Sequence, residues 1–104
     1  MPIHPSDCPL EPITRLLGGK WKVRILWAVY QAGRIRFNKL KQDVGGITDL
    51  SLTKCLKEFV DNDIISRQQF MEVPPHVEYS LTENGQNLIA ALLSLRQWSR
   101  AQDE

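Results

Sequence analysis

The fold is decided by residues 37–81, FNKLKQDVGGITDLSLTKCLKEFVDNDIISRQQFMEVPPHVEYSL. Their periodicity predicts a short helix to about residue 44, a turn at Gly45-Gly46 and a longer helix to about residue 62. Two β-forming segments, 65–73 and 76–81, then flank Pro74-Pro75, which bars ladder hydrogen bonds and predicts a rigid hairpin loop. The stretch therefore predicts a helix-turn-helix followed by a β-wing.

Both helices of this stretch have recognisable caps and inner faces. Asn38 is expected to cap the first helix, whose Leu40 and Val44 face inward. Thr48 or Asp49 is expected to cap the second helix. The inner stripe of the second helix comprises Leu52, Leu56, Phe59 and Val60, so that Thr53, Lys54, Lys57 and Asp61 point outward.

Amphipathic helices are predicted on both sides of the stretch. One begins near Glu11-Pro12, since proline suits a first helical turn, and ends at Gly18-Gly19. Another spans about residues 20–32, with Lys20, Lys22 and Arg24 near its start, where the helix dipole disfavours cations and calls for an acid or a phosphate. A one-rung strand at residues 35–37 follows, and Thr82 begins a last helix to about residue 101.

These elements predict a mainly α fold with a small β-wing, an α+β winged helix-turn-helix. Residues 1–10, with three prolines, are expected to form an N-terminal arm, and residues 11–104 a single domain. A chain of 104 residues with 42% hydrophobic residues is enough for one core. The apolar runs are far shorter than the roughly 20 residues of a membrane span, and no secretory signal is expected.

Cysteine and charge usage narrow the class of protein. Cys8 and Cys55 form neither a CxxC motif nor a disulfide scaffold, so a cytoplasmic protein without metal or cofactor is expected. Residues 15–57 carry ten Lys/Arg and two Asp/Glu, a charge of +8, whereas the rest of the chain carries three and ten, a charge of −7, which together give the net +1. Charge alone leaves DNA binding and an ordinary solvated surface equally open.

Candidate DNA contacts fall into three groups. Outward positions at the start of the second helix can reach phosphates or base edges: Thr48, Leu50, Ser51, Thr53, Lys54 and Lys57. A second group lies before and within the first helix, which crosses the DNA backbone in such folds: Arg34, Arg36, Asn38, Lys39 and Lys41, with Lys20 and Lys22 as additions. For Lys41 solubility is the favoured interpretation. The third group is His76 alone, in the wing between Glu72 and Glu78, and its contribution is expected to be modest.

Several segments together resemble one known family. They are Cys8-Pro9, Gly18-Gly19-Lys20-Trp21, Arg36-Phe37-Asn38-x-Leu40, Gly46-Ile47-Thr48, Leu52-Thr53-x-x-Leu56 and Glu72-Val73-Pro74-Pro75-His76-Val77-Glu78-Tyr79-Ser80-Leu81-Thr82. Over about residues 8–98 the chain resembles the HxlR-type winged-helix regulators of bacteria, relatives of the MarR type. Leu50 stands where family members often carry a basic or long polar residue, so it is expected to contact a thymine methyl or to pack locally.

The resemblance implies a cytoplasmic homodimer that binds a pseudo-palindromic DNA operator and regulates transcription. The terminal helices would form the dimer through Ile13, Leu16, Leu17, Leu88, Leu92, Leu95 and Trp98, since the apolar surface of the last helix is broader than one domain can cover. Double-stranded DNA and a second copy are the expected partners. The aromatic residues near these helices are more often core than ligand pocket, so no small-molecule effector is inferred.

Two alternatives remain open. Cys8 is either a thiol sensor, as in some members of this family, or an inert thiol, whereas Cys55 is expected to fill space beside the core. The fold could instead mediate protein contacts without binding DNA, and the salt dependence of binding separates these two functions. A thiol enzyme is not expected, because the two cysteines are far apart and the histidines, His4 and His76, lie in weak contexts.

Overall fold

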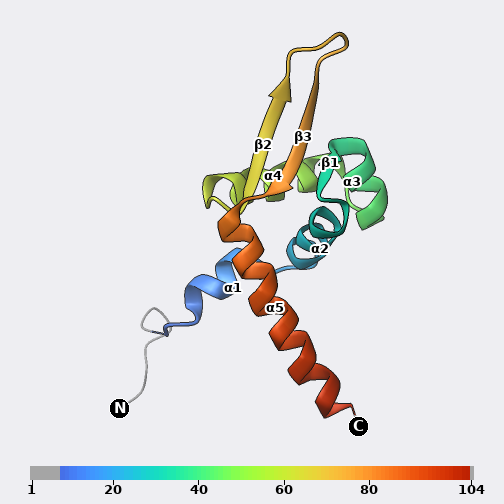
Figure 1. The fold of residues 1–104 in the computed structure, drawn as a ribbon. Helices are drawn as coiled ribbons and strands as arrows, with labels where there is room; N and C mark the ends of the chain where they lie inside the picture. Colours follow the sequence, from blue (N-terminus) through green and yellow to red (C-terminus); the bar gives the residue numbers. More distant parts are fainter. Residues whose placement is uncertain (1–7, 104) are drawn as a thin grey trace.

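The computed structural model describes residues 8–103 and has the predicted order of elements (Figure 1). The elements are α1 (Glu11–Leu17), α2 (Lys22–Ala32), β1 (Arg34–Arg36), α3 (Phe37–Val44), α4 (Asp49–Asp61), β2 (Ile65–Phe70), β3 (His76–Leu81) and α5 (Glu83–Gln102). Residues 1–7, most of the predicted N-terminal arm, lie outside the described part of the chain. The predicted α+β winged helix-turn-helix is confirmed.

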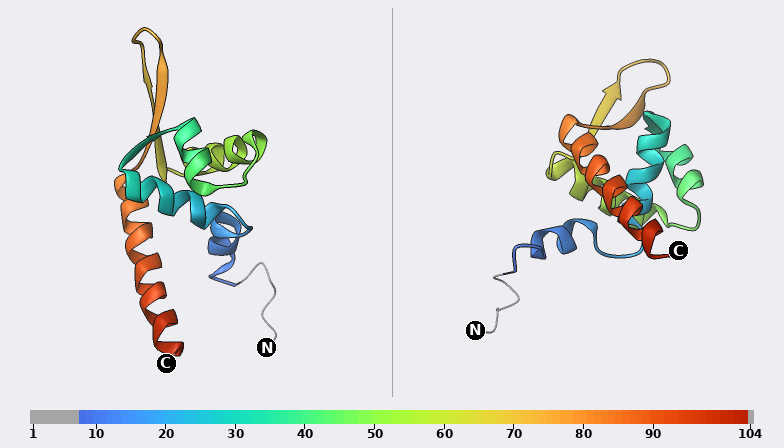
Figure 2. Two further views of the ribbon diagram at one scale, coloured as in Figure 1. Left: turned by 90° about the vertical axis from the view of Figure 1, so that its right-hand side faces the viewer. Right: turned by 60° about the horizontal axis from the view of Figure 1, so that its bottom comes forward.

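The strands form one antiparallel sheet in the order β1-β3-β2. The wing hairpin pairs Ile65 with Leu81 at its base and Phe70 with His76 near its tip. β1 pairs with the other edge of β3, where Ile35 lies opposite Tyr79. The hairpin projects from one end of the helical body, while α1 and the free part of α5 lie at the other end (Figures 1 and 2).

The hydrophobic core lies where α2, α3 and α4 meet the base of the sheet. Its largest fully buried side chains are Phe59, Ile25, Leu26, Leu40, Leu52, Ile65 and Val29. Burying each such side chain stabilises the fold by roughly 1.5–3 kcal/mol. The predicted inward faces of both helices of the pair are therefore confirmed, with Val44 and Val60 half-buried at their ends.

Some predicted boundaries are wrong by a few residues. α3 begins at Phe37, so Asn38 lies inside its first turn and does not cap it. The reason is that β1 holds the chain extended up to Arg36, which then takes the N-cap position. α2 begins at Lys22, because Gly19 has a positive φ of 95° and Trp21 takes the N-cap. The strand predicted to reach residue 73 ends at Phe70.

Two predicted caps are present. The Thr48 side chain accepts a hydrogen bond from the backbone N–H of Ser51, so the cap of α4 is Thr48 and not Asp49. The Thr82 side chain likewise accepts one from the N–H of Gly85 at the start of α5. Each such cap contributes about 1 kcal/mol. None of the helices within residues 8–103 has the length and apolarity to cross a membrane.

Candidate nucleic-acid interface

The turn between α3 and α4 sets the direction of the second helix. Gly45 and Gly46 both have positive φ, 75° and 82°, a conformation in which a side chain would be strained. The Lys41 ammonium pairs with the Asp49 carboxylate at 2.7 Å across this turn. Lys41 therefore helps to connect α3 to the first turn of α4.

The outward face of α4 carries the predicted contact residues. Leu50 is 80% exposed in the first turn, and Thr53, Lys54 and Lys57 are exposed beyond it. Lys57 pairs with Asp61 at 2.9 Å, and the hydrogen bond and charge of Asp61 raise the pKa of the Lys57 ammonium. Within residues 8–103 Lys54 takes part in no ion pair, so its charge is the more available of the two.

The basic residues before and within α3 lie beside β3, the second strand of the wing. Arg34 and Arg36 are exposed on β1 and form no ion pair with any other described residue. Lys39 pairs with Asp43 at 3.0 Å. The structure brings together in one open hollow residues of α3, β1 and β3: Arg36, Phe37, Asn38, Lys39, His76 and Val77. The hollow thus brings together members of two predicted groups of DNA contacts, the basic group around α3 and His76 of the wing.

His76 is less free than its position in the wing implies. Its side chain is only 13% exposed and stacks on Phe70, with ring centroids 4.7 Å apart. Its Nε2 lies 2.9 Å from the Glu78 carboxylate, and its Nδ1 lies 3.9 Å from that of Glu72. The wing tip beyond it exposes Met71 and Val73 and carries no Lys or Arg. A phosphate would have to compete with two carboxylates for this imidazole.

Arg67 is a basic residue that the sequence analysis did not single out. It lines a hollow between α4 and the sheet together with Thr53, Lys57 and Tyr79. The alternation of β2 would have revealed it, because Arg67 shares a strand face with the buried Ile65. That face of the strand packs toward α4.

Lys20 and Lys22, the two possible additions to the phosphate clamp, each have a partner within the molecule. The Lys22 ammonium pairs with Glu58 of α4, so an acid accounts for the cation at the start of α2. The Lys20 ammonium lies over the Trp21 ring, 4.7 Å from its centroid, a cation–π arrangement. Lys22 therefore has a structural position inside the molecule.

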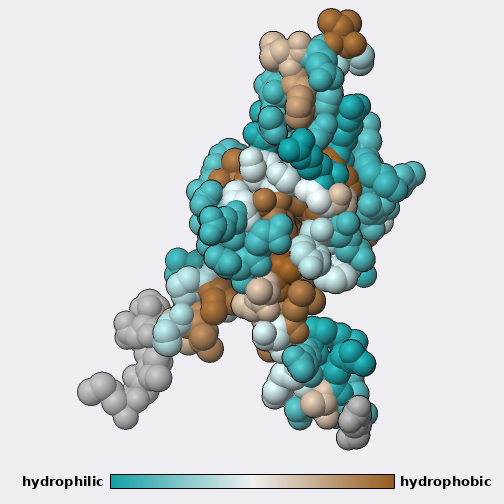
Figure 3. All heavy atoms as spheres, viewed as in Figure 1, coloured by the Kyte–Doolittle hydropathy of each residue, from teal (hydrophilic) through white to brown (hydrophobic). Residues whose placement is uncertain are grey.

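The predicted dimer residues divide into two sets. Leu16, Leu17, Leu88 and Leu92 are half-buried against the core of the same chain. Ile13, Leu95 and Trp98 are exposed, the last two by 58% and 62%. Figure 3 shows hydrophobic atoms gathered around α1 and the adjoining part of α5, below the helical body. The exposed set therefore offers a second subunit more apolar surface per residue than the half-buried set does.

Both cysteines are free and partly exposed. Cys8 lies just before α1, and its carbonyl oxygen accepts a hydrogen bond from the N–H of Glu11. Cys55 packs beside the core, as predicted. Burial, followed by the nearby Glu58 carboxylate, raises the pKa of the Cys55 thiol, which disfavours the reactive thiolate.

A two-helix unit with a tight glycine turn, an exposed second helix and a flanking β-hairpin defines the winged helix-turn-helix class. The chain belongs to the HxlR-like helix-turn-helix family, whose profile matches residues 16–104. It is a transcriptional regulator with a helix-turn-helix domain.

Known relatives match nearly the whole chain. The regulatory protein MalR of Fusobacterium mortiferum is 40% identical over 93 residues, which cover 89% of this chain and 88% of MalR. The crystal structure of a MarR-family transcriptional regulator from Enterococcus faecalis V583 is 34% identical, with a TM-score of 0.85 over 90% of this chain and 84% of that one. The oxidised form of the redox regulator HypR is 36% identical, with a TM-score of 0.80 over 90% and 96%.

Proposed function

We propose that the protein binds a pseudo-palindromic DNA operator as a homodimer and regulates transcription from it. The observation that carries this proposal is the outward face of α4, where Lys54 is exposed, forms no ion pair within the described residues and follows the exposed Leu50 and Thr53. Lysine can reach guanine O6 and N7 or neutralise a phosphate, and threonine and leucine can contact a thymine methyl. α4 would thus be the recognition helix in the major groove.

The remaining groups would hold the backbone on either side of α4. Arg34, Arg36 and Lys39 would contact phosphates beside α3, which crosses the backbone in helix-turn-helix complexes. Arg67, between α4 and the wing, would contact a phosphate on the other side. Two recognition helices in a dimer would address half-sites roughly 34–36 Å apart.

Replacing Lys54 with alanine is expected to lower operator affinity by at least ~30-fold, because a dimer loses two contacts worth about 1 kcal/mol or more each. The operator is first obtained by selecting bound sequences from random duplexes, and affinities are then measured by fluorescence anisotropy at several salt concentrations. The slope of log affinity against log salt should also become shallower. Lys57→Ala is the matched control on the same helix, and its effect should be smaller because Asp61 already pairs with Lys57.

The same affinity measurement compares the contribution of the wing with that of α4. His76→Ala is expected to weaken binding less than Lys54→Ala does, because the His76 ring already faces Glu78. A larger loss at His76 would reverse this ranking. Association that does not respond to salt would instead support the alternative, a winged helix that binds proteins.

A second proposal is that Cys8 makes DNA binding responsive to oxidants. It is favoured by the similarity to the redox regulator HypR and by the place of Cys8 at the start of α1, next to the candidate dimer surface. Oxidation of Cys8 to a mixed or intersubunit disulfide would displace α1.

Diamide is expected to lower operator binding of the wild-type protein and to leave Cys8→Ser unaffected, because the thiolate that it oxidises is absent from that variant. Gel shifts and non-reducing electrophoresis of the same samples measure binding and cross-linking together. Cys55→Ser is the matched control and should respond like the wild type. Unchanged binding without any cross-linked or mixed-disulfide species would remove the redox role.

A further inference from the structure

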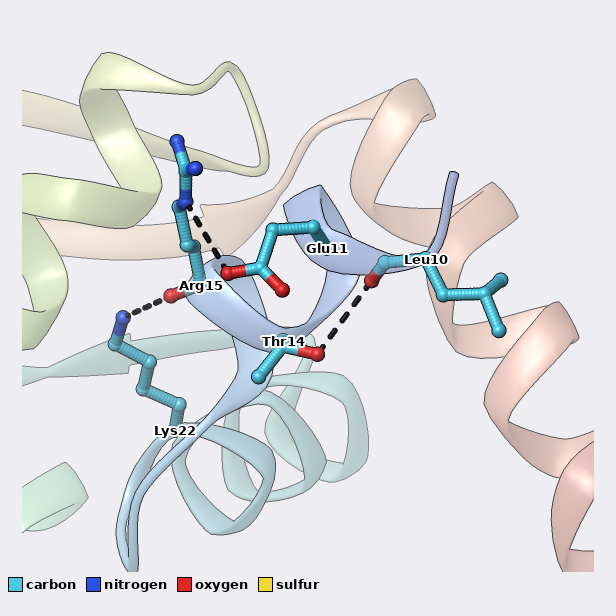
Figure 4. A network of polar contacts seen from close by, with 5 residues as sticks. All are labelled: Leu10, Glu11, Thr14, Arg15 and Lys22. Atoms are coloured by element: carbon cyan, nitrogen blue, oxygen red, sulfur yellow. Dashed lines mark hydrogen bonds and ion pairs between the residues drawn. The ribbon is translucent and has the colours of Figure 1, made fainter. Parts of the chain in front are cut away.

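Lys22, at the start of α2, connects α1 to α4. Its Nζ donates a hydrogen bond of 2.9 Å to the carbonyl oxygen of Arg15 in α1, the half of the connection that Figure 4 shows. The same Nζ lies 2.5 Å from the Glu58 carboxylate of α4. The Lys22 side chain is 14% exposed, whereas the lysines of the three Lys–Asp pairs are 42–75% exposed. Lys22 is therefore held in place, unlike those surface lysines.

The Arg15 carbonyl lies in the last turn of α1, where helical carbonyl groups lack an N–H partner in the helix. The backbone N–H of Gly18 donates a hydrogen bond of 2.7 Å to the neighbouring carbonyl oxygen of Thr14. The Lys22 ammonium supplies a donor to Arg15, and a cation at a helix C-terminus also suits the helix dipole. A helix of seven residues is too short to be stable alone, so α1 depends on such tertiary contacts.

Apolar packing between α1 and α4 is thin. α1 has no fully buried residue. A hollow separates the two helices, lined by Pro12, Arg15 and Leu16 of α1 and by Glu58 and Asn62 of α4. The polar bridge through Lys22 crosses from one wall of this hollow to the other. It therefore joins helices that side-chain packing leaves loosely connected.

We propose that Lys22 is a positioning residue that makes α1 and the recognition helix α4 move together, so that a displacement of α1 changes DNA affinity. This inference rests on the proposed function, because it requires α4 to bind DNA. Coupling of this kind is reciprocal, so DNA binding must also alter the environment of α1. Removing the lysine leaves a half-buried carboxylate and a helix-terminal carbonyl without their partner and uncouples the two helices.

The test uses an environment-sensitive fluorophore on Cys8 in a Cys55→Ala background, because the Cys8 carbonyl is bonded to the first turn of α1. Selected operator is added, and fluorescence of the label and anisotropy of the DNA are followed together. The Lys22→Met variant keeps the alkyl stem, loses the ammonium, and is expected to bind at least about fivefold more weakly and to lose the label response. Lys22→Arg, which retains charge and donors, should keep the response and bind within about twofold of the starting protein.

The outcomes are distinct. Operator binding without any label response in the starting protein overturns the inference, as does an equal response in Lys22→Met, while the proposed function stands in both cases. Failure of the starting protein to bind any duplex removes the proposed function and the inference with it. Glu58→Leu removes the acceptor on the α4 side and should reproduce the uncoupling, and thermal melting shows that each variant is folded.

A measurement without DNA tests the geometry of the bridge. In a Cys8→Ser background, the pH dependence of Cys55 alkylation reports the charges beside its thiol. Burial raises the pKa of the Cys55 thiol most, the Glu58 carboxylate raises it further, and the Lys22 ammonium lowers it. Lys22→Met should therefore raise the pKa of the thiol further and Glu58→Gln should lower it. The absence of both shifts would show that the bridge does not form in solution, and would overturn the inference.

Discussion

The double substitution Leu95→Glu/Trp98→Glu is expected to convert the proposed homodimer into monomers and to lower operator affinity by roughly 10²–10⁴-fold. Leu95 and Trp98 lie three residues apart on α5 and are 58% and 62% exposed, although both are large and apolar. A carboxylate buried in an apolar interface has no partner, so the interface would not form. Each freed subunit would then bind a single half-site, without the gain from being joined to its copy.

Sedimentation equilibrium measures the mass, and anisotropy with the selected operator measures the affinity. The matched control is Ser94→Glu/Gln97→Glu, which adds the same two charges to α5 at positions that are already polar and exposed. It should remain dimeric and bind DNA. A wild-type protein that is monomeric at micromolar concentration would contradict the proposed dimer. A Leu95→Glu/Trp98→Glu variant that still dimerises would show that the dimer does not use this end of α5.

Gly85→Ala is expected to destabilise the fold by about 2–4 kcal/mol, although alanine is the better helix former by about 1 kcal/mol. Gly85 is buried in the first turn of α5, and a Cβ there would overlap the backbone carbonyl of Ile64 and lie 3.2 Å from Leu81 Cδ2. The Ile64 carbonyl cannot move aside cheaply, because it accepts hydrogen bonds from the backbone N–H and the hydroxyl of Thr82.

Thermal melting at a fixed protein concentration checks this prediction. For a domain of this size the melting temperature should fall by roughly 10–20 °C. Gln86→Ala, one residue further on and exposed, is the control and should be neutral or slightly stabilising. A Gly85→Ala variant as stable as the wild type would mean that α5 can shift away from the start of β2 at no cost.

Local features of the sequence were enough to predict the class of fold. The glycine pair at 45–46, the Thr48 and Thr82 caps and the inner stripe of α4 each act within a few residues, and all are present. One boundary was wrong because a distant segment decided it. Asn38 lies inside α3 because β1, three residues long, pairs with β3 some forty residues later and carries the extended chain up to Arg36.

The candidate DNA surface was harder to predict than the fold. Its lysines were visible in the sequence, but their ion-pair partners were not. Lys22 meets Glu58 from another helix, whereas Lys54 has no such partner among residues 8–103. Arg67 was passed over, although strand alternation places it on the same face of β2 as Ile65; the packing of that face against α4 then brings it beside Thr53.

What the sequence alone determined is the succession of helices, turn and wing, because hydrophobic period, capping and glycine conformation are properties of neighbouring residues. Only the tertiary structure decided which cations remain available to a phosphate, which glycine is required and which apolar side chains stay exposed. Those properties depend on groups far apart in the chain, since charge pairing and close packing act through space and leave no period in the sequence.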